Sequence, residues 1–161
     1  WLKKQPAKYI VATWGNHDFI GEHPERVPGD LPWNLLVDKT IEIEGICVHG
    51  SPWSKQFGDW PFMADERGLA TQWNKISRHV DILVVHGPPY LACDQVMSGD
   101  NVGSLSLRAW VEDMEPEIVF CGHIHKEHGA CMINKTTVVN CSIMNEKYEP
   151  INKPIVVELD I

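Results

Sequence analysis

The sequence has no run approaching the ~20 apolar residues that a transmembrane helix requires. It is also poor in basic residues, with 14 Lys and Arg against 22 Asp and Glu, and its formal net charge is −8 at pH 7. Proteins that coat a phosphate backbone are usually basic. The composition therefore predicts a chain with no membrane partner and no nucleic-acid partner, and it disfavours a DNA nuclease.

The sequence lacks closely spaced cysteine pairs. Its five cysteines, Cys47, Cys93, Cys121, Cys131 and Cys141, are odd in number, and three of the five lie in apolar, strand-like runs. We interpret them as small buried residues of a protein that stays in a reducing, cytoplasmic compartment. A disulfide framework is not expected.

Three apolar segments each run directly into a short loop that contains glycine and histidine. The segments are 9–14, 81–85 and 117–121, and the loops are Gly-Asn-His-Asp at 15–18, His-Gly-Pro-Pro at 86–89 and Gly-His-Ile-His at 122–125. Such apolar runs predict buried strands. Because ligands of open α/β sheets bind at the carboxyl ends of the strands, we expect the three loops to meet at one edge.

The rest of the chain predicts alternating strands and helices, followed by a run of strands. Further strands are expected at 34–37, 40–44, 46–49, 129–133, 136–141 and 155–159, and helices at 63–77 and 105–114. We expect Ser104 to cap the second helix and 40–49 to open a second sheet. The order predicts an α/β fold, an αββα sandwich of two mixed sheets flanked by helices.

Two segments between these elements are candidates for lining a functional site. The aromatic, turn-rich segment 50–62 either walls a substrate pocket or caps the core, and both interpretations stay open. The long loop 90–103 is typical of lids and specificity elements near a catalytic edge.

The three loops resemble the last three signature blocks of the calcineurin-like metallophosphoesterases. The closest resemblance is to the brain-type metallophosphoesterase-domain (class III-like) phosphodiesterases, and it rests on Pro52-Trp53, Gly58-Asp59-Trp60, the 81–89 stretch and the ending 148–157. The family has two earlier blocks, Asp-x-His and Gly-Asp, for which this sequence has no room. We therefore expect residues 1–161 to be the C-terminal two thirds of such a domain, truncated at its N-terminal side.

The resemblance implies a site with two divalent metal ions, Mn, Fe or Zn. Imidazole and amide ligands suit metals of this kind. In the family pattern the residues matching Asn16, His86 and His123 hold one metal, and the residue matching His125 helps to hold its neighbour. The bridging carboxylate and the remaining ligands come from the two earlier blocks.

Four other residues have implied or candidate roles. By resemblance, His17 faces the leaving oxygen as proton donor or electrostatic clamp, and Asp18 orients its ring. His49, which closes an apolar run in His-Gly-Ser-Pro, and His128, three residues after the last motif, are candidate substrate-binding residues.

The predicted function is that of a metal-dependent phosphodiesterase. It would hydrolyse a small phosphoester or nucleotide, such as a cyclic nucleotide, by attack of a metal-bridging hydroxide. The alternative is a catalytically weak nucleotide-binding or scaffold protein that keeps the fold with an incomplete metal site.

Overall fold

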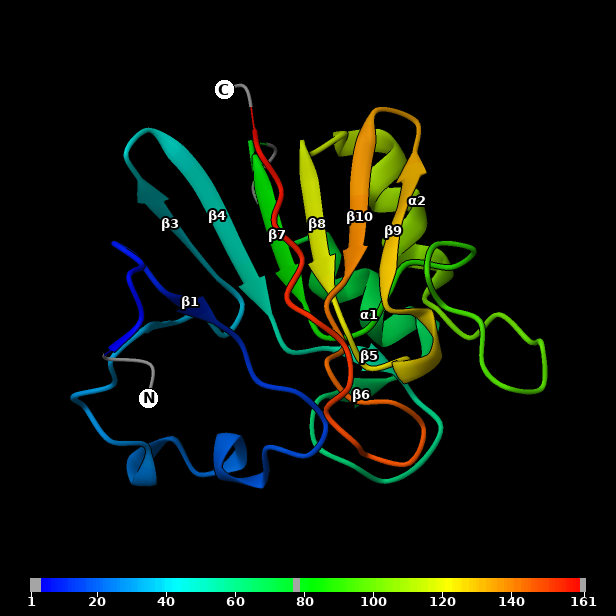
Figure 1. Cartoon of the computed structure of the whole chain (residues 1–161), viewed down its shortest axis with the longest axis horizontal. Coiled ribbons are helices and arrows are strands. Elements are labelled where there is room, and N and C mark those ends of the chain that lie inside the picture. The colour runs from blue at the N-terminus through cyan, green and yellow to red at the C-terminus, as the bar shows by residue number, and fades with distance from the viewer. Residues whose placement is uncertain (1–3, 77–78, 160–161) are drawn as a thin grey trace.

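The computed structural model describes residues 4–76 and 79–159. Within these residues, six strands form one mixed sheet in the order β3-β4-β7-β8-β10-β9 (Figure 1). Their bounds are Lys39–Ile43 (β3), Ile46–Ser51 (β4), Ile82–Val85 (β7), Ile118–Cys121 (β8), Gly129–Ile133 (β9) and Thr136–Asn140 (β10). The four central strands are parallel, whereas β3 and β9 pair antiparallel at the two edges. Parallel alignment brings the carboxyl ends of β4, β7, β8 and β10 to one edge.

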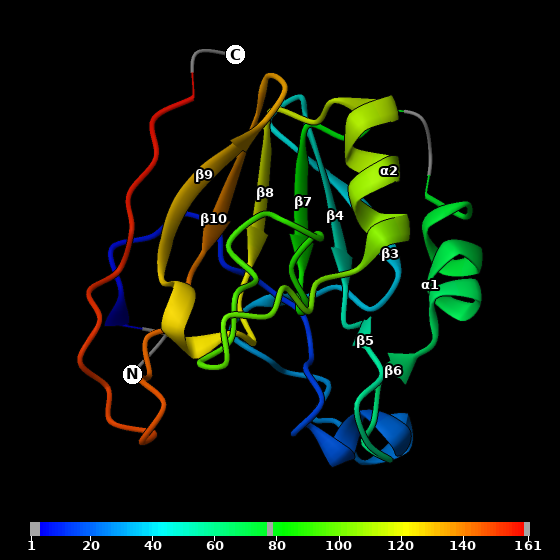
Figure 2. The same cartoon turned by 90° about the vertical axis from the view of Figure 1, so that its right-hand side faces the viewer.

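Two helices, α1 (Glu66–Trp73) and α2 (Leu105–Met114), cover one face of this sheet (Figure 2). Each begins at a side-chain cap, since Asp65 accepts from the backbone N–H of Gly68 and Ser104 accepts from that of Leu107. Their buried apolar residues join those of the sheet in one core: Leu69, Trp73, Leu107, Trp110 and Val111 with Leu83, Val85, Val119 and Val138. Burial of this stripe fixes both helices against the strands that carry the histidine loops.

The Glu66 carboxylate joins α1 to the beginning of α2. It accepts hydrogen bonds from the backbone N–H groups of Leu105 and Ser106, both at 3.0 Å, and from the hydroxyls of Ser104 and Ser106. Burial alone would raise the pKa of Glu66, but these hydrogen bonds outweigh it and lower the pKa. A negative charge at the amino end of a helix is stabilising.

We expect Glu66→Gln to destabilise the protein by about 1 kcal/mol, because the charge at the amino end of α2 is lost and the site is partly exposed. The pKa of Glu66 is lower in the folded protein than in the unfolded chain, where it is near 4.5. The stabilisation by the charged carboxylate is therefore fully present above pH 4.5 and is lost as the pH falls through the pKa of the folded state. Thermal melts should therefore show a lower Tm for the variant at pH 7 and a smaller difference in acid. Glu112→Gln, which removes an exposed partner of Arg108, is the control. Equal losses in the two variants at pH 7 would contradict this role.

Shorter elements complete the fold. β1 (Val11–Ala12) pairs in parallel with β2 (Asn34–Leu35), and β5 (Ser54–Lys55) pairs in parallel with β6 (Met63–Ala64). Three 3₁₀ turns are η2 (Phe19–Glu22), η3 (Pro24–Arg26) and η4 (His125–Glu127). The segment around β1 and the extended C-terminal segment lie on the side of the sheet away from the helices (Figures 1 and 2). In the part of the chain described here, no helix has the length and apolar character needed to cross a membrane.

The predicted α/β class is confirmed, with a central mixed sheet and helices packed against it. In place of the two mixed sheets expected for the αββα sandwich, the described residues form one six-stranded sheet and two two-stranded pairs. The expectation that 40–49 opens a second sheet is wrong, since β4 pairs in parallel with β7 and belongs to the central sheet. The strand predicted at 155–159 is also wrong, because this segment is extended but makes no ladder, and Val156 is 87% exposed. The strand at 9–14 shrinks to β1, and the first helix begins at Glu66. The predicted end of that helix, Ser77, lies outside the described residues.

Candidate metal centre

The loops after β7 and β8 lie side by side at the carboxyl edge of the sheet. The backbone N–H of His86 donates to the carbonyl oxygen of Ser51 at the end of β4, at 3.1 Å, and the N–H of Gly122 donates to the carbonyl oxygen of His86 at 3.0 Å. The loop that carries His86 is thus fixed between its two neighbouring strands. This placement brings His86 next to His123, as the parallel topology predicts.

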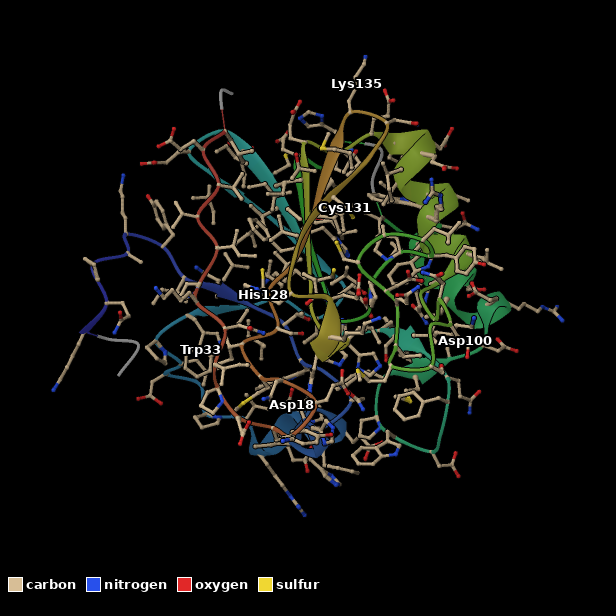
Figure 3. All side chains as sticks on the ribbon, turned by 45° about the vertical axis from the view of Figure 1, so that its right-hand side comes forward. Asp18, Trp33, Asp100, His128, Cys131 and Lys135 are labelled. Carbon is tan, nitrogen blue, oxygen red and sulfur yellow. The ribbon has the colours of Figure 1, made fainter. Side chains whose placement is uncertain are left out.

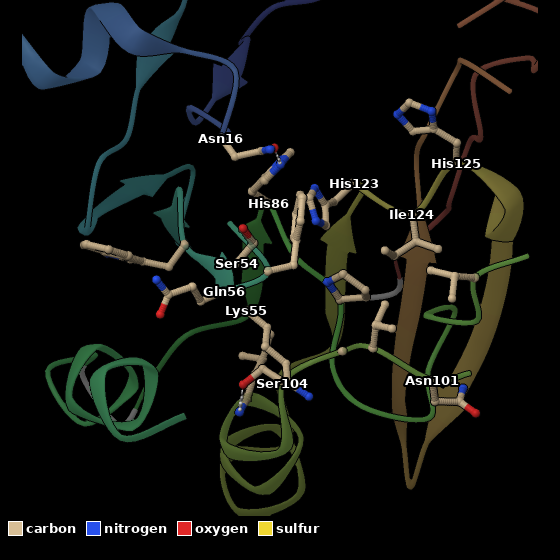
Figure 4. Close-up of a pocket in the computed structure, with 18 of the residues that line it drawn as sticks. Asn16, Ser54, Lys55, Gln56, His86, Asn101, Ser104, His123, Ile124 and His125 are labelled. Carbon is tan, nitrogen blue, oxygen red and sulfur yellow. Dashed lines mark hydrogen bonds between the residues drawn. The ribbon is translucent and has the colours of Figure 1, made fainter. Parts of the chain in front are cut away.

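The loop after β1 completes the group from the other side of the site. Asn16 Oδ1 lies 2.7 Å from His86 Nε2 (Figure 4), and Asn16 is only 1% exposed. A Cβ atom at Gly15 would lie 2.5–2.9 Å from atoms of the His86 ring, so a larger residue there would force this ring to shift. The approach of Asn16 to His86 therefore depends on Gly15.

Asp18 closes this loop on itself. Its Oδ2 accepts from the backbone N–H of Gly15 at 2.7 Å, and its own N–H donates to the carbonyl oxygen of Gly15 at 3.0 Å. The tight turn thus directs Oδ2 of Asp18 to the backbone, and the role of Asp18 in orienting the His17 ring stays a prediction. His17 is exposed and packs edge-on against Trp60, with 4.5 Å between ring centroids.

His86 and His123 form the centre of the site. Their ring centroids are 4.7 Å apart at an interplanar angle of 63°. Burial lowers the pKa of His86 to about 3, with further contributions from His123, His17 and His125, and burial and the neighbouring histidines lower the pKa of His123 to about 4. Both imidazoles are consequently neutral at physiological pH, which is the form that binds metal ions.

The backbone of His123 lies in the left-handed region, with φ at 67°. This conformation is costly for a residue other than glycine and persists only where the surroundings impose it. Here it turns the chain between β8 and η4, and Figure 4 shows the ring of His123 beside that of His86.

His125 lies farther from this group. Figure 4 shows it apart from His86 and His123. Its Nδ1 is 3.1 Å from the carbonyl oxygen of Asn145, and its ring packs edge-on against Tyr148, with 5.1 Å between ring centroids. It lines the same cavity as Asn16, His86 and His123. The structure therefore brings three of the predicted ligands together and leaves the fourth at the margin.

The group opens into a cavity of about 510 Å³. Two aromatic side chains from the segment 50–62 form part of its wall: Trp53, and Phe57, whose ring lies 5.6 Å from that of His123. Trp53 also packs against the hydrophobic core, so the segment both lines this cavity and covers part of the core. The 90–103 loop also lines the cavity, through Val96, Asn101, Val102 and Gly103.

His49 and His128 do not line this cavity. β4 continues to Ser51, so His49 lies within the strand, where its Nδ1 contacts Thr40 Oγ1 at 2.8 Å and burial lowers its pKa against the opposing effect of Asp38. His128 follows η4, and its Nε2 lies 2.9 Å from the carbonyl oxygen of Lys153. The candidate substrate-binding role of these two residues therefore has no support from the lining of this cavity.

Several cavity residues had no signal in the sequence. Trp73 and Leu107 come from the helices, Ser104 is the cap of α2, and Tyr148 lies in the C-terminal segment. The packing of α1 and α2 against the sheet brings Trp73, Leu107 and Ser104 to the cavity, and Tyr148 reaches it from the C-terminal segment, where its ring packs against His125.

The donor atoms fit part of a metal coordination shell. Two atoms that ligate one ion lie about 3 Å apart, because each is about 2.1 Å from the ion, and the Asn16–His86 distance matches this spacing. Neutral imidazole and amide oxygen suit borderline divalent metals. Among the described residues, one group of three His, Cys, Asp or Glu side chains has all its donor atoms within 4.8 Å of one another. It consists of Cys47, His79 and Asp81 and lies at the opposite end of β4. No described Asp or Glu therefore forms a group of this kind with both His86 and His123.

The cysteines differ from the sequence-based expectation. Cys121 is buried, but Cys47, Cys93 and Cys131 are partly exposed and Cys141 is exposed, and all five are free thiols. The interpretation of all five as buried residues is therefore wrong.

Comparison with known proteins supports the relationship that these motifs indicate. A family model described as calcineurin-like phosphoesterase matches residues 1–127. The human and mouse proteins named metallophosphoesterase domain-containing protein 1 are each 36% identical over 187 residues, which cover 99% of this chain and 57% of the relative. A UPF0046 protein of Caenorhabditis elegans is 30% identical over 128 residues, covering 78% of this chain and 32% of the relative.

The fold has relatives among solved structures. One matches with a TM-score of 0.61 and 16% identity, over 82% of this chain and 56% of the other. The crystal structure of TT1561 of Thermus thermophilus matches with a TM-score of 0.52 and 15% identity, over 82% of this chain and 62% of the other. The chain spans about 57% of the length of the human and mouse relatives. Since the family model covers most of the sequence, the chain belongs to the calcineurin-like phosphoesterase family.

Proposed function

We propose that the protein is a metal-dependent phosphoesterase whose site is the cavity at the carboxyl edge of the sheet. The observation that carries the proposal is the convergence of Asn16, His86 and His123 from three separate loops, with the amide oxygen 2.7 Å from the imidazole nitrogen. Family membership supports it, since calcineurin-like phosphoesterases typically use divalent metal ions.

In this proposal Asn16, His86 and His123 hold a divalent ion, and His125 contributes to a second one. Bound metal supplies Lewis-acid polarisation of the phosphate and activation of a water molecule. Gly15 keeps Asn16 in position by allowing its loop to approach the His86 ring. The neutral state of both buried imidazoles leaves their nitrogen lone pairs available without loss of a proton.

His17 is the proposed proton donor to the leaving oxygen. It lines the cavity together with the ligands but does not belong to the buried cluster. Trp60 packs against its ring and limits its orientation. A positioned imidazole of this kind can supply the proton that the departing alkoxide needs.

The finer assignment is a dinuclear phosphodiesterase of a reducing, cytoplasmic compartment, which acts on small phosphoesters such as cyclic nucleotides, with manganese, iron or zinc. The cavity supports a substrate with a flat apolar part, since Phe57, which is 68% exposed, and Tyr148, which is 65% exposed, stand at its wall beside the histidines. The acidic net charge of −8 supports a small-molecule partner over a nucleic acid.

Metal removal tests the proposed activity. Hydrolysis of bis(p-nitrophenyl) phosphate and of a cyclic nucleotide should fall to background after the purified protein is treated with a chelator, and should return on addition of Mn²⁺. Mg²⁺ or Ca²⁺, which prefer oxygen ligands, should restore less. Hydrolysis that persists unchanged in the chelated protein, after metal analysis has shown it to be metal-free, would contradict the proposal.

A second candidate is a nucleotide-binding or scaffold protein with weak turnover. The observation that favours it is the lack of a carboxylate ligand among the described residues around His86 and His123. It predicts at most one weakly bound ion per chain and nucleotide binding without hydrolysis. Isothermal titration with Mn²⁺ and with a nucleotide, beside the hydrolysis assay, separates the two functions.

A further inference from the structure

Two cysteines that are distant in the sequence meet between the 90–103 loop and β9. The Sγ atoms of Cys93 and Cys131 are 2.9 Å apart. Cys93 lies in the 90–103 loop, and Cys131 lies in the middle of the edge strand β9, opposite Val138 of β10. Figure 3 labels Cys131 on β9 and Asp100 of the 90–103 loop. The contact between the two sulfur atoms therefore joins this loop to the edge of the sheet.

Contacts other than those of the thiols hold Cys93 in this place. The side-chain amide of Asn140 donates both to the carbonyl oxygen of Cys93, at 3.1 Å, and to that of Ile124, at 2.9 Å. The carboxylate of Asp94 accepts from the backbone N–H groups of Leu91 and Gly103 and ties the two ends of the loop together.

The backbone of Cys93 is in the left-handed region, with φ at 54°. A residue other than glycine keeps this conformation only where neighbouring contacts impose it. The surrounding contacts thus hold the backbone of Cys93 in a conformation that directs its thiol to Cys131. The contact between the two sulfur atoms therefore follows from the fold of the loop as well as from the side-chain rotamers.

Metal binding does not explain the pair. A structural zinc site needs four ligands, and no third donor of His, Cys, Asp or Glu in the described residues joins both sulfur atoms within 4.8 Å. Cys121, a further thiol close enough to interact electrostatically with Cys131, is buried. Two thiols in contact and partly exposed are instead suited to oxidation.

We propose that Cys93 and Cys131 are a reversible redox pair, which a peroxide converts to a disulfide that fastens the 90–103 loop to β9. The hydrogen bond that the Cys93 thiol donates to the Cys131 sulfur lowers the pKa of Cys131, which makes Cys131 the first nucleophile.

With hydrogen peroxide as the oxidant, the reaction has two steps. The Cys131 thiolate attacks one peroxide oxygen, the O–O bond breaks, and the other oxygen leaves as water after protonation. Cys131 is then a sulfenic acid. The Cys93 sulfur next attacks the Cys131 sulfur, the S–S bond forms as the S–O bond breaks, and the oxygen leaves as a second water with the Cys93 proton. The two thiols lose two electrons, and the peroxide gains them.

The disulfide would act on the wall of the cavity. The loop contributes Val96 and Asn101 to that wall, and Lys126, which follows His125, donates to Gln95 Oε1 at 2.8 Å. Fastening Cys93 would restrict the motion of this wall next to the histidine loop. This inference does not rest on the proposed phosphoesterase function, since disulfide formation can be measured without substrate.

The test is a peptide map of the oxidised protein. The purified protein is treated with a small excess of hydrogen peroxide, its remaining thiols are alkylated, and it is digested without reduction. We expect a peptide that links Cys93 to Cys131 as the main product, lost on addition of dithiothreitol. Because the bond closes a loop of about 40 residues, Tm should rise by roughly 10 °C on oxidation and return on reduction.

Matched variants identify the pair. Cys131→Ser should abolish both the linked peptide and the rise in Tm, whereas Cys141→Ser, at the exposed cysteine, should leave both unchanged. The peptide map of the peroxide-treated wild-type protein tests the proposal even if the Cys131→Ser variant folds poorly. Separate alkylation or separate sulfinic acids at Cys93 and Cys131 after peroxide, or a disulfide to another cysteine, would overturn the proposal.

Discussion

His86→Ala is expected to lose bound metal and phosphoesterase activity together. The side chain is central to the cluster, with Asn16 Oδ1 at 2.7 Å and the His123 ring at 4.7 Å. Loss of a residue that only orients a ligand costs about 10–100-fold in metal affinity, so loss of a ligand should cost more than that. Metal analysis after equilibration with Mn²⁺ and desalting should find wild-type protein loaded and the variant nearly metal-free, with hydrolysis at background.

Two further variants make this result specific. His123→Ala should behave like His86→Ala, because the two imidazoles belong to one cluster. His23→Ala, at an exposed histidine that pairs with Glu25, should retain metal and activity. Melting curves of all three in the metal-free state distinguish loss of a ligand from loss of the fold. Wild-type metal content and hydrolysis in either cluster variant would exclude that residue as a ligand.

His17→Ala is expected to lower turnover and leave metal binding intact. His17 packs against Trp60 and is not part of the buried cluster, so its removal should not change the metal content. Loss of a general acid typically costs about 10²–10⁴-fold in rate. This loss should appear in kcat, while KM stays near its wild-type value.

The leaving group provides the sharpest test of this role. A nitrophenolate departs without a proton, whereas an alkoxide such as the ribose oxygen of a nucleotide needs one. The deficit of His17→Ala should therefore be large for a cyclic nucleotide and small for bis(p-nitrophenyl) phosphate. An equal deficit for both substrates would indicate a role in binding or charge stabilisation, and a loss of metal would make His17 a ligand.

Much of the framework of the site could be predicted from local sequence. Apolar runs at 81–85 and 117–121 predict the strands that become β7 and β8, and parallel pairing of these strands then brings His86 and His123 to the same edge. Ser104 and the helix at 105–114 could be predicted because a side-chain cap and a helical apolar stripe are local signals.

The errors come from features that depend on neighbours distant in the sequence. His49-Gly50-Ser51 looks like the end of a strand, but pairing with β7 extends β4 through Ser51 and leaves His49 inside it. The apolar run at 155–159 has the composition of a strand but finds no partner. In the same way, no periodicity could indicate that Cys93 and Cys131 touch, because Asn140 and the Asp94 hydrogen bonds set that contact.

The central claim is that Asn16, His86 and His123 bind one divalent ion in common, and a crystal structure of the protein grown with Mn²⁺ tests it most directly. The anomalous difference map should show an ion about 2.0–2.3 Å from Asn16 Oδ1 and from one ring nitrogen each of His86 and His123. A map whose main peak lies elsewhere, such as at Cys47, His79 and Asp81, with no ion bound to these three side chains, would contradict it.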